Sequence, residues 1–421
     1  MIWQRSTCEK EVNRMPGPGG LLMLSDALTT DLSSFFGTVK CVYLDPPYYT
    51  GDRFSIRMRV GEEGWANNSR LLTLPAYDDF AGASRETYLS FLRGIITLSH
   101  KLLTDDGSFF LHLDYRASAH ARLLCDEIFG ESNFINDIIW SYQTGGRSKR
   151  YFSRKHDTIL FYGKTPDRYF DITQVPSRRK KDHNNHMKRQ VDEKGRSYRS
   201  IQSGGKTYTY YDDEPSYPDD VWTDVSQMQQ RDPQRTGYPT QKPQMLLDRI
   251  IRCCTKEDDL VADLMCGSGT TLVSASANNR RFLGLDTSPH ALSVSRKRLH
   301  TVGHHVLAPL SDVSAMVDAG VLPGIGFYDV DLNAYTLPSG AFDSLETTPK
   351  DMPIHGLDAV DQWYAGLLSD TTFHVYASAV RTKQSPALPR TLKVPLLRGT
   401  VGIMIIDVLG NRTFWTASSQ V

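Results

Sequence analysis

The sequence predicts a doubly wound α/β sheet, because three features of the chain point to alternating strands and helices. Apolar runs alternate with amphipathic helical stripes over residues 21–142, and the alternation returns over residues 244–299. Within the second stretch, a loop with two glycines joins a short apolar run to a helical pattern. A sheet of this kind binds ligands at the carboxyl ends of its strands, and we therefore expect the functional residues there.

The first stretch begins with an apolar run at residues 21–28, which predicts a buried strand running into a loop, and a short helix is expected at about 27–36. Residues 50–80 are polar, contain glycine and show no sustained period, so they are predicted to form a long loop. The other elements expected are strands at 40–44, 108–113, 135–142 and 158–162, and amphipathic helices at 87–103 and 117–129.

The second stretch repeats the pattern after the period is lost between residues 143 and 238. The elements expected there are a helix from Gln244, strands at 260–264 and 281–285, and helices at 271–278 and 289–299. After about residue 305 the chain is punctuated by Pro and Gly, with candidate strands at 373–380 and 401–408. This last part is predicted to be a small appended α+β domain.

Charge is unevenly distributed along the chain, although the formal net charge is zero. Residues 143–206 hold 17 Lys and Arg against 6 Asp and Glu, whereas residues 305–421 hold 7 against 11. The basic middle predicts a localised phosphate-binding face, and the alternative is a solvated insertion without a fixed fold. Residues 207–211, Thr-Tyr-Thr-Tyr-Tyr, could form a short aromatic strand within it.

The composition is that of an ordinary globular protein of 421 residues, 40% of them hydrophobic. No run of about 18 apolar residues exists, so no membrane span is expected, and the first residues lack the apolar region of a secretory signal. The six cysteines contain no C-x-x-C pair. They are interpreted as mostly buried, reduced thiols of a cytoplasmic protein without a structural metal.

The tetrapeptide Asp45-Pro46-Pro47-Tyr48 follows the apolar run at residues 42–44. Two prolines fix the backbone and remove two N–H donors, so this turn presents carbonyl acceptors. A carboxylate, a backbone carbonyl and an aromatic ring together suit an exocyclic amino group and the ring that carries it. The alternative is a proline-rich turn that only closes a strand.

The glycine loop has the sequence DLMCGSGTT over residues 263–271. Its glycines allow close approach of a ligand to the backbone, and a helix start favours negative charge. A nucleoside-triphosphate loop would need Lys after Gly269, and a dinucleotide loop would need a third glycine at Leu272. Neither is present, which leaves a smaller nucleoside whose amino-acid end lies on the loop.

Asp286 ends the strand that follows the glycine loop. A carboxylate about 20 residues after such a loop suits the two hydroxyls of a ribose. The alternative is a helix N-cap, because Thr287-Ser288-Pro289 follows and Pro fits a first helical turn.

Taken in order, the tetrapeptide, the basic segment, Tyr-Pro-Thr-Gln-Lys-Pro at residues 238–243 and the glycine loop resemble the β-class amino-methyltransferases of DNA, which include type III modification subunits. The similarity runs over about residues 20–300. It implies a Rossmann-like methyltransferase sheet with an inserted basic target-recognition region. The family's aromatic residue at the second position after Asp263 is replaced by Met265.

The resemblance implies S-adenosyl-L-methionine as the cofactor and divides the chain into four parts. Residues 1–142 form the catalytic half, 143–236 the target-recognition region (which to about 162 still includes a core strand), 237–305 the cofactor half and 306–421 an accessory domain. Asp263, Gly267 and Gly269 hold the methionine end and Asp286 the ribose. The other implied cofactor residues are Asp26, Thr240, Lys242, Cys266 and Thr270.

By the same resemblance, a flipped-out adenine donates its N6 amine to Asp45 and the Pro46 carbonyl and stacks on Tyr48, while the nitrogen attacks the methyl group. Asp at the first position of the tetrapeptide favours adenine. The alternatives are an N4-cytosine enzyme, an RNA amine methyltransferase and an inactive DNA-binding relative. His112 and Asp114 match the strand beside the base pocket, and His156 is either a family counterpart or a core histidine.

The partners expected are duplex DNA, a second copy of the chain and a subunit of a restriction or other defence system. The C-terminal part, with its negative charge, is the candidate for dimerisation or docking. The predicted phosphate or base contacts are Arg147, Lys149, Arg150, Arg178, Arg179, Lys180 and Lys181.

Overall fold

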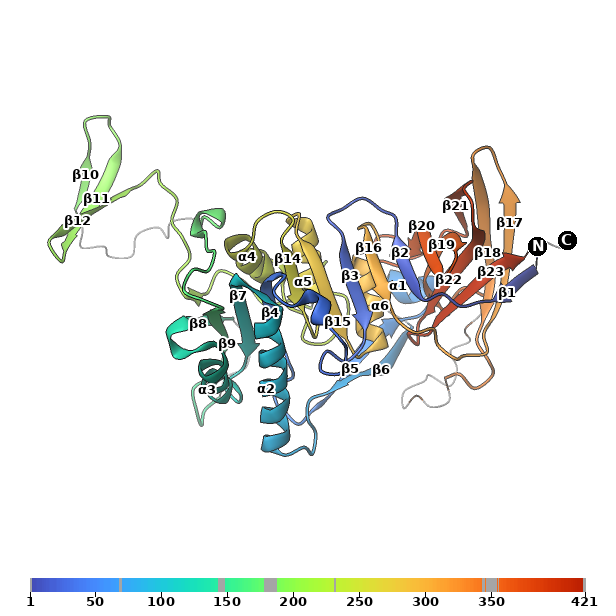
Figure 1. Cartoon of the computed structure of the whole chain (residues 1–421), viewed down its shortest axis with the longest axis horizontal. Helices are drawn as coiled ribbons and strands as arrows, with labels where there is room; N and C mark the ends of the chain where they lie inside the picture. Colours follow the sequence, from blue (N-terminus) through green and yellow to red (C-terminus); the bar gives the residue numbers. More distant parts are fainter. Residues whose placement is uncertain are drawn as a thin grey trace.

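The computed structural model describes residues 2–67, 70–142, 148–177, 188–230, 232–342, 345, 354 and 356–418. One mixed sheet of 15 strands runs along the length of the molecule (Figure 1). Its central strands, in spatial order, are β16 (His304–Leu307), β3 (Gly20–Leu24), β15 (Arg281–Asp286), β14 (Leu260–Asp263), β4 (Val39–Leu44) and β7 (Leu103–Leu113).

Neighbours among these six strands are parallel, so their carboxyl ends share one edge. Beyond β7 the sheet continues with antiparallel β9 (His156–Gly163), then β8 (Phe134–Ser141) and the two-residue β13 (Val221–Trp222). The predicted strand–helix alternation and the doubly wound sheet are confirmed.

Alternate residues of the central strands pack on opposite faces of the sheet, as a strand's twofold period requires. Val42 and Leu44 of β4 face one core, with helices α2 (Arg85–Leu102) and α3 (Ser118–Phe129). Cys41 and Tyr43 face the other, with α4 (Gln244–Cys254) and α6 (Pro289–Arg298), and also α5 (Thr270–Ala277). No helix in the described part of the chain is long and apolar enough to cross a membrane.

Two expectations for the first stretch are wrong. Residues 50–80 are not a loop: they contain the hairpin β5 (Arg53–Arg59) and β6 (Leu71–Asp78), with α1 (Gly61–Asn67) between. Ile56 and Met58 are buried while the intervening arginines point out, so charges masked a strand period. The expected helix at 27–36 is a turn plus the short 3₁₀ helix Ser33–Phe35, because the Asp26 carboxylate accepts the Leu28 N–H and closes a turn.

The insertion carries a separate three-stranded sheet, β10 (Arg189–Val191), β11 (Ser197–Ser203) and β12 (Lys206–Tyr211), which confirms the aromatic strand. In Figure 1 this sheet stands clear of the body at the upper left. None of its residues is buried. We call it the arm.

The part after residue 305 is built from strands, and its described residues contain no helix, so the α+β prediction for it is wrong. Both candidate strands are found. Because the N-terminal strand β2 pairs with β16 on one side and β20 on the other, these strands extend the central sheet. The elements are β1 (Ile2–Arg5), β2 (Lys10–Asn13), β17 (Met316–Pro323), β18 (Phe327–Thr336), β19 (Val360–Ser369), β20 (Thr372–Val380), β21 (Thr391–Pro395), β22 (Thr400–Asp407) and β23 (Arg412–Ser418).

Candidate functional site

A cavity of about 690 Å³ lies at the carboxyl edge of the parallel strands. The ends of β3, β4, β14 and β15 supply its acids, since parallel strands bring their carboxyl ends together. The structure therefore joins the tetrapeptide to the glycine loop across the insertion. The predicted residues that line this cavity are Asp26, Asp45, Pro46, Pro47, Tyr48, Thr240, Lys242, Asp263, Cys266, Gly267, Thr270 and Asp286.

Asp45 receives a donor on each of its oxygens. The Tyr48 hydroxyl donates to Oδ1 at 2.5 Å, and the Lys242 ammonium donates to Oδ2 at 2.5 Å. The Lys242 nitrogen also lies 5.4 Å from the centroid of the Tyr48 ring. Lys242 was expected on the cofactor side alone, and the structure shows that it touches the tetrapeptide acid directly.

The backbone after the tetrapeptide is held from two sides. The Tyr88 hydroxyl of α2 donates to the Pro47 carbonyl at 2.9 Å. Buried Asp79, just after β6, accepts the N–H groups of Tyr49 and Thr50 at 2.8 and 3.1 Å. Tyr49 itself has φ of 61°, a conformation that non-glycine residues rarely adopt. Asp79 was missed because residues 50–80 were assigned to a loop.

The glycine loop has backbone conformations that require glycine, with φ of 50° at Gly267 and 74° at Gly269. A Cβ at Gly267 would lie 3.1 Å from the Tyr238 ring, and one at Gly269 would lie 2.5 Å from Ser295 Oγ of α6. Gly267 lines the cavity, whereas Gly269 packs against α6 and is not among the lining residues.

Asp286 is bound to the backbone by both oxygens: Oδ2 accepts the Gly267 N–H and Oδ1 the Ser288 N–H, each at 2.8 Å. The N-cap of α6 is Ser288, whose side chain accepts the Ala291 N–H, so the N-cap interpretation of Asp286 is wrong. A carboxylate has about four lone-pair sites and can accept further donors from a ligand. Burial raises the pKa of this carboxyl.

Asp263 lies deepest among these acids and is 3% exposed. Thr271 donates its hydroxyl to Oδ2 at 2.5 Å, and the Met265 N–H donates to Oδ1 at 3.2 Å. Burial raises the pKa of Asp263 to about 7, although these hydrogen bonds act in the opposite direction. The pair with Thr271 fixes the first turn of α5 beside the cavity.

A second cavity of about 350 Å³ adjoins the first. Tyr48 and Lys242 line both, so the tetrapeptide stands between them. Trp140 and Tyr142 of the β8 end give the second cavity aromatic walls. The other lining residues are Asp114, Asp157, Gln227, Met228, Arg235, Tyr238, Thr240 and Gln241.

Behind this cavity runs a buried chain of polar groups. Asp157 Oδ1 accepts the Tyr142 hydroxyl at 3.0 Å, and Oδ2 lies 3.2 Å from His112 Nε2. His112 Nδ1 lies 2.8 Å from the Tyr43 hydroxyl, and the His112 ring stacks on Tyr48 at 6.2 Å between centroids. Burial acts to raise the pKa of Asp157, but the bond to His112 outweighs it and the pKa lies below its ordinary value.

The structure places His112 and Asp114 beside the tetrapeptide, as predicted, whereas His156 is exposed and is not a core histidine. Lys149 and Arg150 lie in the loop between β8 and β9. Arg147, Arg178, Arg179, Lys180 and Lys181 lie outside the described residues. Within the described part of the chain, no group of three His, Cys, Asp or Glu side chains could hold a metal ion.

Comparison with known proteins identifies the family. A family model described as DNA methylase, of the N6 and N4 type, matches residues 39–297. The chain belongs to this family of DNA methylases, and its cofactor is S-adenosylmethionine.

Several characterised relatives are similar to parts of the chain. The type II methyltransferase M.EcaI of Enterobacter cloacae is 28% identical, with 65% of this chain and 66% of the relative covered. The DNA adenine methyltransferase YhdJ of Escherichia coli K12 is 24% identical, with 66% and 81% covered. The EcoP15I Mod subunit of Escherichia coli is 25% identical, but only 32% and 22% are covered.

Solved structures give more distant matches. The PvuII cytosine-N4-specific DNA methyltransferase is 16% identical, covers 70% of this chain and 90% of its own, and has a TM-score of 0.45. A DNA modification methylase of Thermus thermophilus, TTHA0409, solved with S-adenosyl-L-methionine, is 17% identical, covers 69% and 99%, and has a TM-score of 0.41.

Proposed function

We propose that this chain transfers a methyl group from S-adenosylmethionine to the N6 amine of an adenine flipped out of duplex DNA. The observation that carries the proposal is the position of Asp45 and Tyr48 between two adjoining cavities. One cavity has the glycine loop and ribose-type acid of a nucleoside site, and the other has aromatic walls. A donor and an acceptor molecule would thus meet at Asp45.

The larger cavity fits the cofactor by its donor set. Backbone approaches closely at Gly267, where a Cβ would crowd Tyr238, and the N-terminus of α5 favours a carboxylate. Asp286 would accept the ribose hydroxyls. Asp26 and the Asp263–Thr271 pair border the amino-acid end. The cofactor, when bound, supplies an electrophilic methyl group.

The residues of the chain would do the rest by placement. Asp45 keeps lone pairs for an amine although Tyr48 and Lys242 already donate to it. The rigid prolines fix the Pro46 carbonyl as the second acceptor. Two acceptors hold the amine's hydrogens and favour a tetrahedral nitrogen, whose lone pair is then aimed at the methyl group. Orientation and electrostatics therefore account for the acceleration, without a covalent enzyme intermediate.

Adenine is favoured over cytosine by two supports. The tetrapeptide begins with Asp45, which by family resemblance goes mostly with adenine, and one relative is named a DNA adenine methyltransferase. The family includes N4 enzymes, so N4-cytosine is the second candidate.

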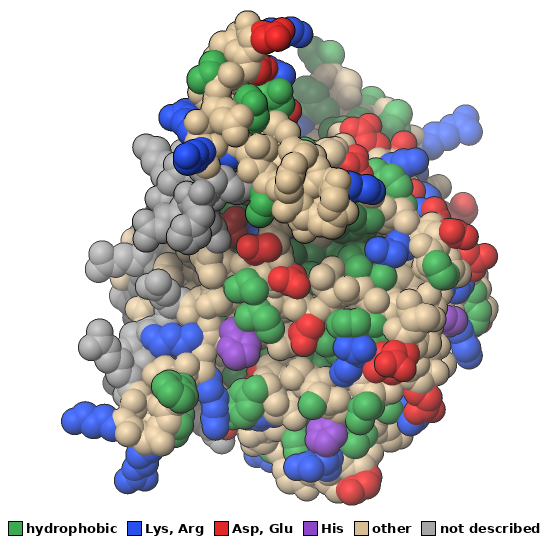
Figure 2. Space-filling model, turned by 90° about the vertical axis from the view of Figure 1, so that its left-hand side faces the viewer, with side chains coloured by type: hydrophobic (Ala, Val, Ile, Leu, Met, Phe, Trp, Pro, Cys, Tyr) green, Lys and Arg blue, Asp and Glu red, His purple; other side chains and the backbone are tan. Residues whose placement is uncertain are grey.

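The arm is the proposed DNA contact within the insertion. The Cα atoms of Arg189, Arg199 and Tyr210 are paired across its three strands, so these side chains share one face, together with Lys206 and Tyr208. The opposite face carries Gln, Ser, Thr and Tyr from the strands and no charge. Basic side chains protrude from the arm at the top of Figure 2. A phosphate backbone suits the basic, aromatic face.

A nucleoside analysis tests the proposal. Purified protein is incubated with labelled S-adenosylmethionine and duplex DNA, the DNA is digested, and the methylated nucleosides are separated by mass spectrometry. N6-methyldeoxyadenosine is expected. N4-methyldeoxycytidine would establish the second candidate, and methylation of RNA alone would contradict the DNA substrate. Sequencing of the modified positions then gives the recognition site.

A further inference from the structure

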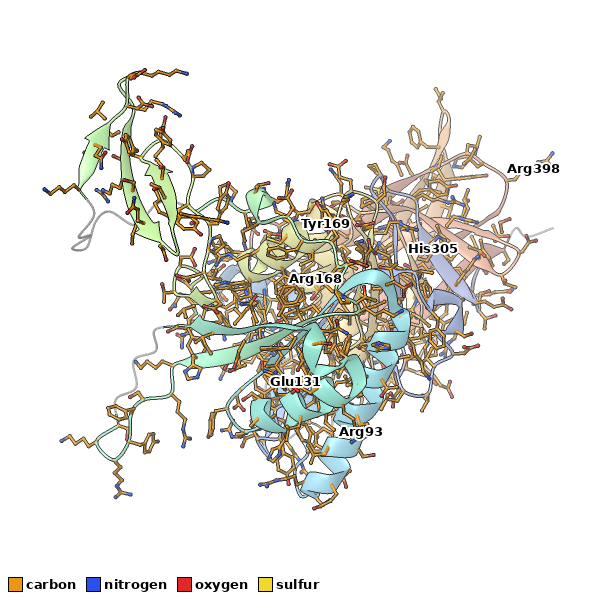
Figure 3. All side chains as sticks on the ribbon, turned by 60° about the vertical axis from the view of Figure 1, so that its left-hand side comes forward. Arg93, Glu131, Arg168, Tyr169, His305 and Arg398 are labelled. Atoms are coloured by element: carbon orange, nitrogen blue, oxygen red, sulfur yellow. The ribbon has the colours of Figure 1, made fainter. Side chains whose placement is uncertain are left out.

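The loop over residues 148–155 lies at the mouth of the second cavity. It follows the end of β8, whose Trp140 lines that cavity, and precedes β9, whose second residue, Asp157, also lines it. The Tyr142 N–H donates to the Lys155 carbonyl at 3.0 Å and closes the base of the loop. Because β9 is antiparallel to β7, its first residues lie at the carboxyl edge where the tetrapeptide stands. Figure 3 shows the loop projecting outward at the lower left.

The described part of the loop has a defined shape. Ser148 Oγ accepts the N–H groups of Arg150 and Tyr151, and the Ser148 N–H donates to Ser153 Oγ. At the C-terminal side, the Arg154 guanidinium donates to the Tyr115 hydroxyl at 2.5 Å and lies 4.2 Å from the centroid of that ring. Tyr115 adjoins Asp114 of the second cavity, so the loop is anchored to the cavity wall.

Phe152 is at the tip, and its side chain is 100% exposed. A buried phenylalanine stabilises a fold by roughly 1.5–3 kcal/mol, and Phe152 contributes nothing of this kind. Its surroundings are cationic: Lys149, Arg150 and Arg154 share the segment, which contains no Asp or Glu between residues 148 and 155. In Figure 2 basic side chains protrude at the lower left, where the loop lies. An apolar ring among cations suits the stacked bases and phosphates of DNA.

We propose that Phe152 enters the base stack of duplex DNA at the step from which the target base leaves. The inference rests on the proposed function, because only a flipped base leaves such a gap. Removing a base from the stack costs a few kcal/mol, and an inserted apolar side chain offsets part of this by restoring stacking contact. The cations at residues 149, 150 and 154 would hold the flanking phosphates, and the anchor on Tyr115 would set the distance between the ring and the base cavity.

The test compares one DNA sequence as a duplex and as a single strand, because a single strand has no partner stack to fill. Methyl transfer from labelled S-adenosylmethionine is measured for wild type, Phe152→Ala, Phe152→Trp and the control Ile325→Ala. Ile325 is 98% exposed in the turn between β17 and β18, far along the sheet from the cavities. For Phe152→Ala we expect the rate on duplex to fall about tenfold or more while the single-strand rate changes less than about twofold. Phe152→Trp retains duplex activity, and Ile325→Ala behaves as wild type.

A second readout does not depend on turnover. With 2-aminopurine at the mapped target position, wild type raises the fluorescence of the duplex when it flips the base, and Phe152→Ala raises it less. Equal loss on duplex and single strand would overturn the proposal, as would no loss on either. If wild type labels neither substrate but binds S-adenosylmethionine, the proposed function itself fails, and that result is distinct from a variant that loses duplex activity alone or loses none.

Discussion

Lys242 places its ammonium nitrogen 2.5 Å from Oδ2 of Asp45, although 197 positions separate the two residues. Lys242 precedes α4, and Asp45 follows β4, so the contact joins the two halves of the chain that the insertion separates. Its partner is the acid proposed to hold the target amine. Lys242 is therefore expected to position Asp45 in addition to bordering the cofactor cavity.

Replacing Lys242 separates these two roles. Lys242→Ala is expected to lower kcat on DNA by about 10- to 100-fold, since a misplaced hydrogen-bond acceptor costs orientation of the amine. The Kd for S-adenosylmethionine, measured by calorimetry, should change by less than about threefold. Lys242→Arg keeps a cation and should recover part of kcat. A large loss of cofactor affinity with unchanged kcat would return Lys242 to the cofactor pocket alone.

The raised pKa of Asp263 predicts a pH dependence of stability. The folded state binds this proton more tightly than the unfolded chain, so the contribution is complete below about pH 4 and is lost as the pH rises through about 7. Between about pH 5 and pH 8 the loss is on the order of 2 kcal/mol. Urea unfolding of Asp263→Asn should show this much less pH dependence than wild type. The exposed Asp52→Asn serves as the control, and identical pH profiles for all three proteins would contradict the prediction.

A buried ion cluster fastens the C-terminal strands to the cofactor half. Glu11 of β2 pairs with Arg296 of α6 and with Arg412 of β23, and all three are at most 4% exposed. Glu11→Ala would leave two buried cations without their acid, which costs about 3–5 kcal/mol. The exposed pair of Arg53 and Asp78 gives the control, since Arg53→Ala should cost less than about 1 kcal/mol. Equal effects on the midpoint of chemical unfolding would contradict this assignment.

The basic face of the arm predicts salt-dependent DNA binding. Lys206→Ala should weaken binding to duplexes of any sequence and reduce the slope of log K against log salt by about one. Lys393, exposed on β21, is the matched control and should leave both unchanged. Fluorescence anisotropy at several salt concentrations measures the slope. A sequence-dependent loss for Lys206→Ala with an unchanged slope would make this residue a base contact instead.

Much of the fold and the site is legible in the sequence, because local patterns encode it. Residues 41–44 alternate between two cores, and the acids at positions 45, 263 and 286 end strands whose parallel order brings them together. The hairpin at residues 53–78 was hidden, because arginines between Phe54, Ile56 and Met58 suppressed the apolar average. The contacts of Asp79 with Tyr49 and of Lys242 with Asp45 depend on tertiary placement, for which no local period exists.

The central claim is that Asp45 holds the amine that accepts the methyl group. The most direct test is the single-turnover rate of methyl transfer by Asp45→Ala, with the protein saturated with S-adenosylmethionine and in excess over DNA. Calorimetry on the same variant checks cofactor binding. We expect binding of S-adenosylmethionine to be retained and methyl transfer to be lost by about a thousandfold or more. Transfer within about tenfold of wild type would contradict the account.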